Sequence, residues 1–197
     1  MSPDTLIDLD RAATLWINSL GSPASDPLWT LLSDTRVWFP AYAVVLYFLF
    51  RRLGWKRGLI ALAALILTIV ATDQFSNFVK DSVQRLRPCY DTAMLEGGLR
   101  WPVRRHSFYG FHSAHAANCF AFILCSLQEF RMDRGHSYSG YALGGILWAS
   151  LVSLSRIMVG MHFLGDILAG ALCGSIIGLM MAALAAFITR KAGLSPS

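Results

Sequence analysis

The sequence has long runs without any charged residue, and this absence decides its physical class. Of its 197 residues, 55% are apolar, and the mean hydropathy is positive at +0.49. A chain of this composition does not have water as its only solvent. We therefore predict a single membrane-embedded domain over residues 1–197.

A disulfide framework and a cleavable leader are also missing. Three of the four cysteines, Cys119, Cys125 and Cys173, lie inside apolar runs, so we interpret them as packing residues. At the amino terminus, Asp4 and Asp8 stand where a secretory signal would carry a basic run before its apolar core. We expect the chain to insert through its own membrane spans.

The positive charges do not form an accessible stripe. The net charge is +5, but the cations sit between apolar runs. This distribution argues against a nucleic-acid partner and favours the bilayer and a phosphorylated membrane lipid. The sequence leaves the oligomeric state open.

Apolar periodicity predicts an all-α, polytopic membrane helix bundle. Within an N-terminal segment of residues 1–33, residues 4–20 are amphipathic, which predicts a helix lying at the membrane interface. Five segments are candidates for membrane spans. They are 37–50 extended back to about Asp34, 58–79, 113–127, 139–161 and 163–188. The third is the least apolar, which indicates that it faces the bundle interior.

Five spans divide the loop cations into two sets of eight, so the positive-inside rule gives a tie. The first set is Arg51, Arg52, Lys56, Arg57, Arg131, Arg134, Arg190 and Lys191. The second is Arg36, Lys80, Arg85, Arg87, Arg100, Arg104, Arg105 and Arg156. Because the first set is clustered in short loops and a tail, we expect it on the cytoplasmic side of a bacterial inner membrane. The second set then faces the periplasm.

The second span ends in a polar stripe that contains Lys80 and Arg87. Pro88 disfavours helical geometry at Arg87, so we expect the helix to end there. The two cations could then hold two oxygens of one phosphate. A pair of cations that snorkel to the interface is the alternative.

A helix start is predicted at residues 111–118, where polar groups give way to an apolar run. Ser113 suits the N-cap, and the free amides of the first turn, that of Ala114 included, would then point at a bound anion. His115 in that turn could donate a proton to a leaving oxygen. An ordinary cap beside a buried histidine is the alternative.

The third cluster joins Ser155 and Arg156 to His162 and Asp166. His162 and Asp166 are four residues apart on a helix, so the carboxylate could accept from one ring nitrogen and leave the other free to attack. Gly170, Gly174 and Gly178 continue this stripe, which predicts close packing on a neighbouring helix. A purely structural ion pair is the alternative.

No metal or other cofactor is expected, because neither His-x-x-Glu-like pairs nor carboxylate clusters occur near these residues. Fixed cations would take the place of a metal. Arg104 and Arg105, in an aromatic loop, are candidates for headgroup binding, with a simple aromatic belt as the alternative.

Taken together, residues 80–166 resemble the tripartite motif of the type 2 phosphatidic acid phosphatase family, which vanadium haloperoxidases share. The middle motif departs from the usual Pro-Ser-Gly-His, since His112 and Ala114 replace the proline and the glycine. The resemblance implies that His162 is the nucleophile, Asp166 orients it and His115 is the general acid. It implies a phosphate cradle of Lys80, Arg87, Ser113, Ala114 and Arg156.

We therefore expect a metal-independent lipid phosphatase that works through a phosphohistidine. Undecaprenyl pyrophosphate is the first choice of substrate, and phosphatidylglycerol phosphate, phosphatidic acid and lipid A 1-phosphate remain open. A lipid or anion transporter would use the same basic pocket for binding only. A haloperoxidase is a second rival, but its soluble setting conflicts with the spans.

Overall fold

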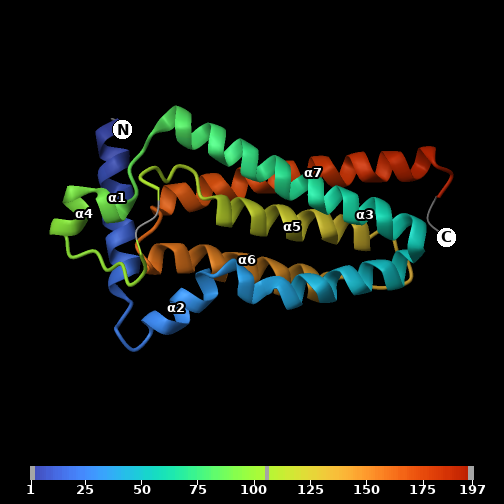
Figure 1. Cartoon of the computed structure of the whole chain (residues 1–197), viewed down its shortest axis with the longest axis horizontal. Helices are drawn as coiled ribbons and strands as arrows, with labels where there is room; N and C mark the ends of the chain where they lie inside the picture. Colours follow the sequence, from blue (N-terminus) through green and yellow to red (C-terminus); the bar gives the residue numbers. More distant parts are fainter. Residues whose placement is uncertain (1–2, 105–106, 195–197) are drawn as a thin grey trace.

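The computed structural model describes residues 3–104 and 107–194, and in these ranges it is built from helices and loops (Figure 1). Its helices are α1 (Pro3–Ser19), α2 (Asp26–Ser33), η1 (Thr35–Trp38), α3 (Phe39–Val83), η2 (Pro88–Tyr90), α4 (Thr92–Glu96), α5 (Ala114–Phe130), α6 (Ser139–Met158) and α7 (Leu164–Lys191). The predicted all-α membrane bundle is confirmed.

α3 consists of two arms that meet at Gly54. This residue has φ 75° and ψ 172°, a conformation that glycine adopts at little cost, and the chain reverses direction there (Figure 1). The arms correspond to the first two predicted spans. Within the described residues, three stretches are long and apolar enough to cross a membrane, namely Thr35–Val83, α6 and α7. Thr35–Val83 has 49 residues, whereas one crossing needs about 20.

α5 lies inside the bundle, packed against α3, α6 and α7 (Figure 1). Small and apolar side chains such as Ala117, Ala121 and Phe122 are buried along its length. With 17 residues, the helix is at the lower end of the range that crosses the hydrocarbon. The modest hydropathy of this segment therefore reflects burial against protein, as expected.

α7 packs on α5 through the predicted glycine stripe, which the structure confirms. A Cβ added at Gly174 would lie 2.1 Å from the carbonyl oxygen of Ala117. At Gly170 and Gly178 the corresponding distances, to the carbonyls of Ser113 and Ala121, are both 2.5 Å. Only glycine allows this close approach. The contact therefore fixes the position of α7 along the bundle axis relative to the start of α5.

α1 lies across one end of the bundle (Figure 1). It turns its polar residues Thr14 and Asn18 toward the protein, where both are buried, and Asn18 donates to the Ile157 carbonyl over 2.9 Å. Leu6 and Trp16 on its other face are 57% and 66% exposed. The helix thus offers its apolar face to the surroundings, as an interfacial helix does.

The two ends of the bundle differ in what they carry. The carboxyl end of α3, the start of α5 and the α6–α7 junction meet at the end that α1 covers (Figure 1). The turn at Gly54, the α5–α6 loop and the carboxyl terminus of α7 lie at the other (Figure 1). The three sequence clusters therefore share one end, as predicted.

Two glycine substitutions separate close packing from helix propensity. Gly174→Ala should lower the thermal unfolding temperature in detergent, because the new methyl collides with Ala117 and overpacking costs about 1–3 kcal/mol. Gly144→Ala in α6, where a Cβ meets no atom within 4 Å, should be neutral or stabilising by up to about 1 kcal/mol. Equal unfolding temperatures for the two variants would contradict the close α5–α7 contact.

Candidate functional site

A pocket of about 530 Å³ opens at the end of the bundle where the three clusters meet. Its lining residues come from α2, η1, α3, α5, α6 and the loops between them. They are Thr30, Ser33, Asp34, Thr35, Arg36, Lys80, Arg87, Val103, Ala114, His115, Arg156 and His162. Six of the predicted site residues therefore line one cavity, although they are up to 82 positions apart in the sequence.

Lys80 and Arg87 reach the pocket from different local structures, which corrects one prediction. The helix does not continue to Arg87, because α3 ends at Val83 and Gln84 takes the left-handed conformation at φ 52°. Arg87 then lies in an extended segment, where its amide donates to the Phe108 carbonyl over 2.9 Å. The backbone contact with the following loop, and not a helical stripe, places this guanidinium.

Arg87 is held by uncharged partners. Its Nε donates to the Ser107 carbonyl over 2.7 Å, and one terminal nitrogen lies 3.2 Å from the Met161 carbonyl. The same nitrogen lies 3.2 Å from Nε2 of His162. Only 7% of Arg87 is exposed, and this burial lowers the pKa of the guanidinium. The charge faces the pocket without a carboxylate bonded to it.

His162 lies in the loop between α6 and α7 and is almost fully buried. Its Nδ1 is 3.4 Å from Oδ2 of Asp166, so Nδ1 is the natural donor, and the unprotonated Nε2 faces the pocket and accepts from Arg87. Burial, followed by the nearby arginine and lysine charges, holds the pKa of His162 well below its ordinary value. The imidazole is therefore neutral near pH 7.

Asp166 sits behind His162, in the first turn of α7, and does not line the pocket. Its Oδ2 accepts from the Phe163 amide over 3.0 Å, and its Oδ1 accepts from Arg85 over 2.9 Å. The sequence motifs did not include Arg85. The contact is tertiary, since Arg85 and Asp166 are 81 positions apart, so no local spacing signals it.

Ser113 and His115 begin α5 as predicted. Ser113 is the N-cap, with its hydroxyl 3.4 Å from the Ala116 amide nitrogen, and its side chain is fully buried. It is not among the residues that line the pocket, and its expected direct contact with phosphate stays a prediction. Ala114 and His115 do line the pocket, and Nε2 of His115 lies 3.3 Å from the Thr35 hydroxyl.

Arg156 projects from the end of α6 and is 8% exposed. One terminal nitrogen donates to the Ser33 hydroxyl, whereas Nε is buried without a hydrogen-bond acceptor among the described residues. A buried N–H without a hydrogen bond costs free energy, and an anion in the pocket would accept a hydrogen bond from it. Ser33 and Thr35 escaped the sequence reasoning because no local spacing relates them to residues more than 75 positions away.

The described part of the aromatic loop reaches the pocket. Val103 lines the pocket, but Arg104 is exposed and is not a lining residue. Arg105 lies outside the described residues. A headgroup role for Arg104 and Arg105 stays a prediction.

The arrangement suits a tetrahedral anion. Lys80, Arg87 and Arg156 line one cavity with the neutral imidazole of His162. Preorganised cations stabilise charge on a phosphoryl group, while the free ring nitrogen can attack phosphorus.

Known proteins with similar sequences are named as lipid phosphatases. The chain is 32% identical over 193 residues to lipid A 4'-phosphatase of Bacteroides thetaiotaomicron, covering 94% of this chain and 81% of the relative. It is 28% identical over 174 residues to lipid A 4'-phosphatase of Porphyromonas gingivalis, covering 88% and 71%. Phosphatidylglycerophosphatase B of Bacillus subtilis is 29% identical over 113 residues, covering 54% and 49%.

Two crystal structures share the fold. The transmembrane PAP2 type phosphatidylglycerolphosphate phosphatase of Bacillus subtilis has a TM-score of 0.68 at 18% identity, covering 95% of this chain and 87% of that one. Aquifex aeolicus LpxE has a TM-score of 0.60 at 23% identity, covering 90% and 94%. The family model described as PAP2 superfamily matches residues 57–190, which is more than half of the chain. The chain belongs to the PAP2 superfamily and is a membrane phosphatase.

Proposed function

We propose that the protein hydrolyses a phosphorylated lipid through a phosphohistidine at His162, with no metal taking part. One observation carries this proposal: Nε2 of His162 lies 3.2 Å from Arg87 at the wall of a pocket that Lys80 and Arg156 also line. An attacking nitrogen and three fixed cations thus share one small cavity. His115 lines the same cavity and can act as the general acid.

The reaction proceeds in two balanced steps. Nε2 forms a bond to phosphorus as the bond to the lipid oxygen breaks, and that oxygen takes a proton from His115. Water then attacks phosphorus, its proton goes to His115, and the bond to His162 breaks to release orthophosphate. The cations remain on the phosphoryl oxygens throughout, and Asp166 stabilises the charge that develops on the imidazole.

For the substrate, we propose a glycolipid of the lipid A class. Two relatives named lipid A 4'-phosphatases support this choice, and one of them aligns with 94% of the chain. The pocket wall formed by α2 and η1 offers hydroxyl and charged groups for sugar hydroxyls, among them Thr30, Asp34 and Arg36. Thr30 and Asp34 also line an adjacent hollow of about 440 Å³, which leaves room for a saccharide beyond the phosphate.

Two other lipids compete with this proposal. Phosphatidylglycerol phosphate is supported by the Bacillus subtilis relative and by the crystal structure with the highest TM-score given above. Undecaprenyl pyrophosphate, the first choice from the sequence, is not named by any of these relatives. Both lipids belong in the substrate test below.

The site is proposed to face the periplasm of a bacterial inner membrane. The positive-inside rule gives a tie, and the clustering of cations in the short loops near the Gly54 turn and at the carboxyl terminus supports that end as the cytoplasmic one. A membrane-impermeant thiol reagent applied from the periplasm should therefore label Arg36→Cys and spare Arg134→Cys; the reverse pattern would invert the orientation.

Trapping the intermediate tests the nucleophile. Wild-type protein that is mixed with a labelled substrate and then quenched should carry acid-labile, base-stable phosphate. The His162→Ala variant should carry no such phosphate and should lose turnover. A chelator is present in both experiments. His115→Ala should slow the burst release of a lipid alcohol about 10²- to 10⁴-fold but slow the burst release of nitrophenolate much less, since nitrophenolate leaves without a proton. Turnover by His162→Ala, or turnover that stops with the chelator, would contradict the mechanism.

The pH dependence follows from the low pKa of His162. Only the neutral imidazole attacks, so activity is lost as pH falls through this pKa, which lies below the ordinary value of about 6.5. In ¹⁵N-histidine NMR of the detergent-solubilised protein, the ring-nitrogen signals of His162 should remain those of a neutral imidazole well below pH 6.5. Arg156→Gln should move its titration upward, because one repelling charge is removed. A wild-type titration at or above pH 6.5 would contradict this account.

Filling the junction between the two hollows tests the substrate class. Thr30→Trp should lower kcat/KM for a lipid A-type substrate at least about tenfold, and should change kcat/KM for phosphatidic acid little. Leu28→Trp is the matched control, since Leu28 is exposed on the same helix and lines neither hollow. Equal losses for both substrates, or faster wild-type turnover of undecaprenyl pyrophosphate or phosphatidylglycerol phosphate, would reject the glycolipid.

A further inference from the structure

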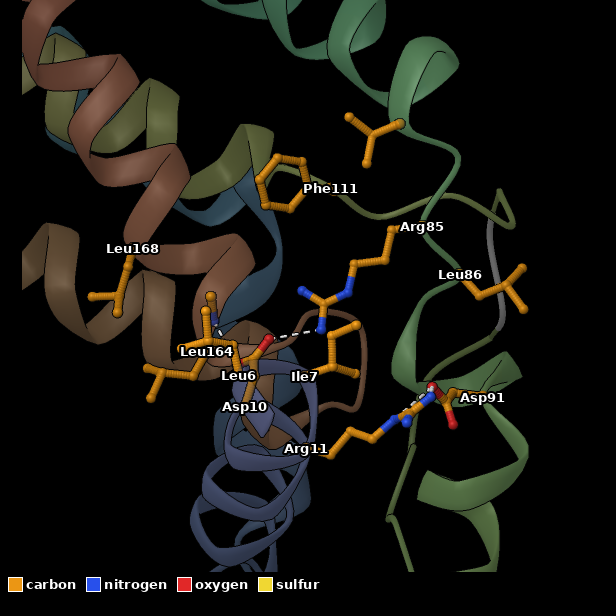
Figure 2. A pocket seen from close by; sticks show the side chains of 12 residues that line it. Leu6, Ile7, Asp10, Arg11, Arg85, Leu86, Asp91, Phe111, Leu164 and Leu168 are labelled. Carbon is orange, nitrogen blue, oxygen red and sulfur yellow. Dashed lines mark hydrogen bonds and ion pairs between the residues drawn. The ribbon is translucent and has the colours of Figure 1, made fainter. Parts of the chain in front are cut away.

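Arg85 bridges two carboxylates from distant parts of the chain. One terminal nitrogen donates to Oδ1 of Asp166 over 2.9 Å, and the other donates to Oδ2 of Asp10 in α1 over 2.7 Å. Figure 2 shows the ion pair between Arg85 and Asp10. The guanidinium also lies over the ring of Phe163, with its carbon 3.9 Å from the ring centre. Three contacts therefore fix one planar group.

The carboxylate of Asp166 depends on this bridge for its orientation. Oδ2 faces the Phe163 amide and Nδ1 of His162, so Oδ1 is the atom left over. Asp166 is fully buried, and a buried carboxylate needs charge and hydrogen bonds on both oxygens. Arg85 supplies both to Oδ1, and it thereby sets the rotation of the carboxylate that faces His162.

Asp10 connects the same bridge to the first turn of α7. Its Oδ1 accepts from the Gly165 amide over 2.8 Å, and Thr14, one turn further along α1, accepts from the Leu164 amide over 2.9 Å. These amides have no partner within their own helix, so α1 serves as the N-terminal cap of α7. A Cβ at residue 165 would lie 2.9 Å from Asp10, which shows how closely the two helices approach.

Arg85 does not share the cavity of the three phosphate-facing cations. It lines a separate hollow of about 720 Å³, together with apolar side chains from α1, α7 and the end of α3 (Figure 2). Both of its terminal nitrogens are occupied by carboxylates. It therefore acts through the groups that it holds, and Asp166 is the one of these whose side chain contacts the imidazole of His162.

We propose that Arg85 is a positioning residue for the phosphatase reaction, which holds Asp166 against His162, and that Asp10 anchors it, so that α1 is part of the catalytic apparatus. This inference rests on the proposed role of His162 as nucleophile. Membership of the family does not supply it, because α1 lies outside the matched residues 57–190.

The test is steady-state kinetics of full-length variants on one lipid substrate. Arg85→Gln should lower kcat about 10- to 100-fold, as loss of an outer hydrogen-bond partner does, and should leave KM nearly unchanged. Arg85→Lys should recover part of this loss, since one ammonium keeps the charge without the fork. Asp10→Asn should have a smaller effect of the same kind.

A double-mutant cycle separates positioning from stability. Combined with Asp166→Asn, the Arg85→Gln change should lower the residual kcat little further, because the carboxylate through which Arg85 is proposed to act on His162 is gone. Arg11→Gln is the matched control. Arg11 lies in α1, as Asp10 does, and lines the same hollow as Arg85. It forms an ion pair with Asp91 over 2.8 Å (Figure 2) and not with Asp166. The Arg11→Gln variant should keep the wild-type kcat.

The outcomes distinguish this inference from the function on which it rests. If Arg85→Gln keeps the wild-type kcat while His162→Ala is inactive, only the positioning role is overturned. Equal losses with and without Asp166, or an equal loss in Arg11→Gln, would also overturn it. Turnover by His162→Ala would instead reject the proposed nucleophile.

Discussion

Three positive side chains are held together without a carboxylate of the described residues bonded to them, and this constraint shapes the active end of the protein. Lys80, Arg87 and Arg156 line one cavity, and the groups that face the two arginines are carbonyls, serine hydroxyls and Nε2 of His162. Like charges repel strongly where water is scarce, so the surrounding structure must supply the stability that keeps them close. A phosphate is the group that relieves the repulsion. The contrast is Arg85, which is bonded to two carboxylates and so is not available to substrate.

The scaffold meets this constraint by fixing where helices end. The glycine contact between α5 and α7 sets the start of α5, where His115 lies, at the level of the α6–α7 junction, where His162 lies. α1 caps α7 from outside the bundle, and the α2–η1 segment contacts Arg156 and His115 from the opposite wall. The N-terminal region thus does more than rest on the membrane. It completes the site that the later helices begin.

The sequence predicted what depends on local spacing. Apolar periodicity gave the spans, Ser113 was recognised as a cap by its residue type, and the four-residue spacing of glycines in α7 predicted close packing. The end of α3 was misplaced, because the left-handed turn at Gln84 has no sequence signature as strong as the proline that follows. The contacts of α1 and α2 were missed because they are tertiary: Asp10 and Arg85 are 75 residues apart. Amphipathicity described only the outward face of α1, whereas the burial of Asn18 depends on contacts with residues about 140 positions away.

A structure with bound vanadate, which mimics the phosphoryl group in transfer, tests the central claim most directly. The account predicts vanadium bonded to Nε2 of His162, with its oxygens contacting Lys80, Arg87 and Arg156 and with Arg87 turned from the imidazole to an oxygen. Vanadate bound away from His162, for example beside Arg85 in the separate hollow, would contradict the claim that these helix ends enclose one tetrahedral anion.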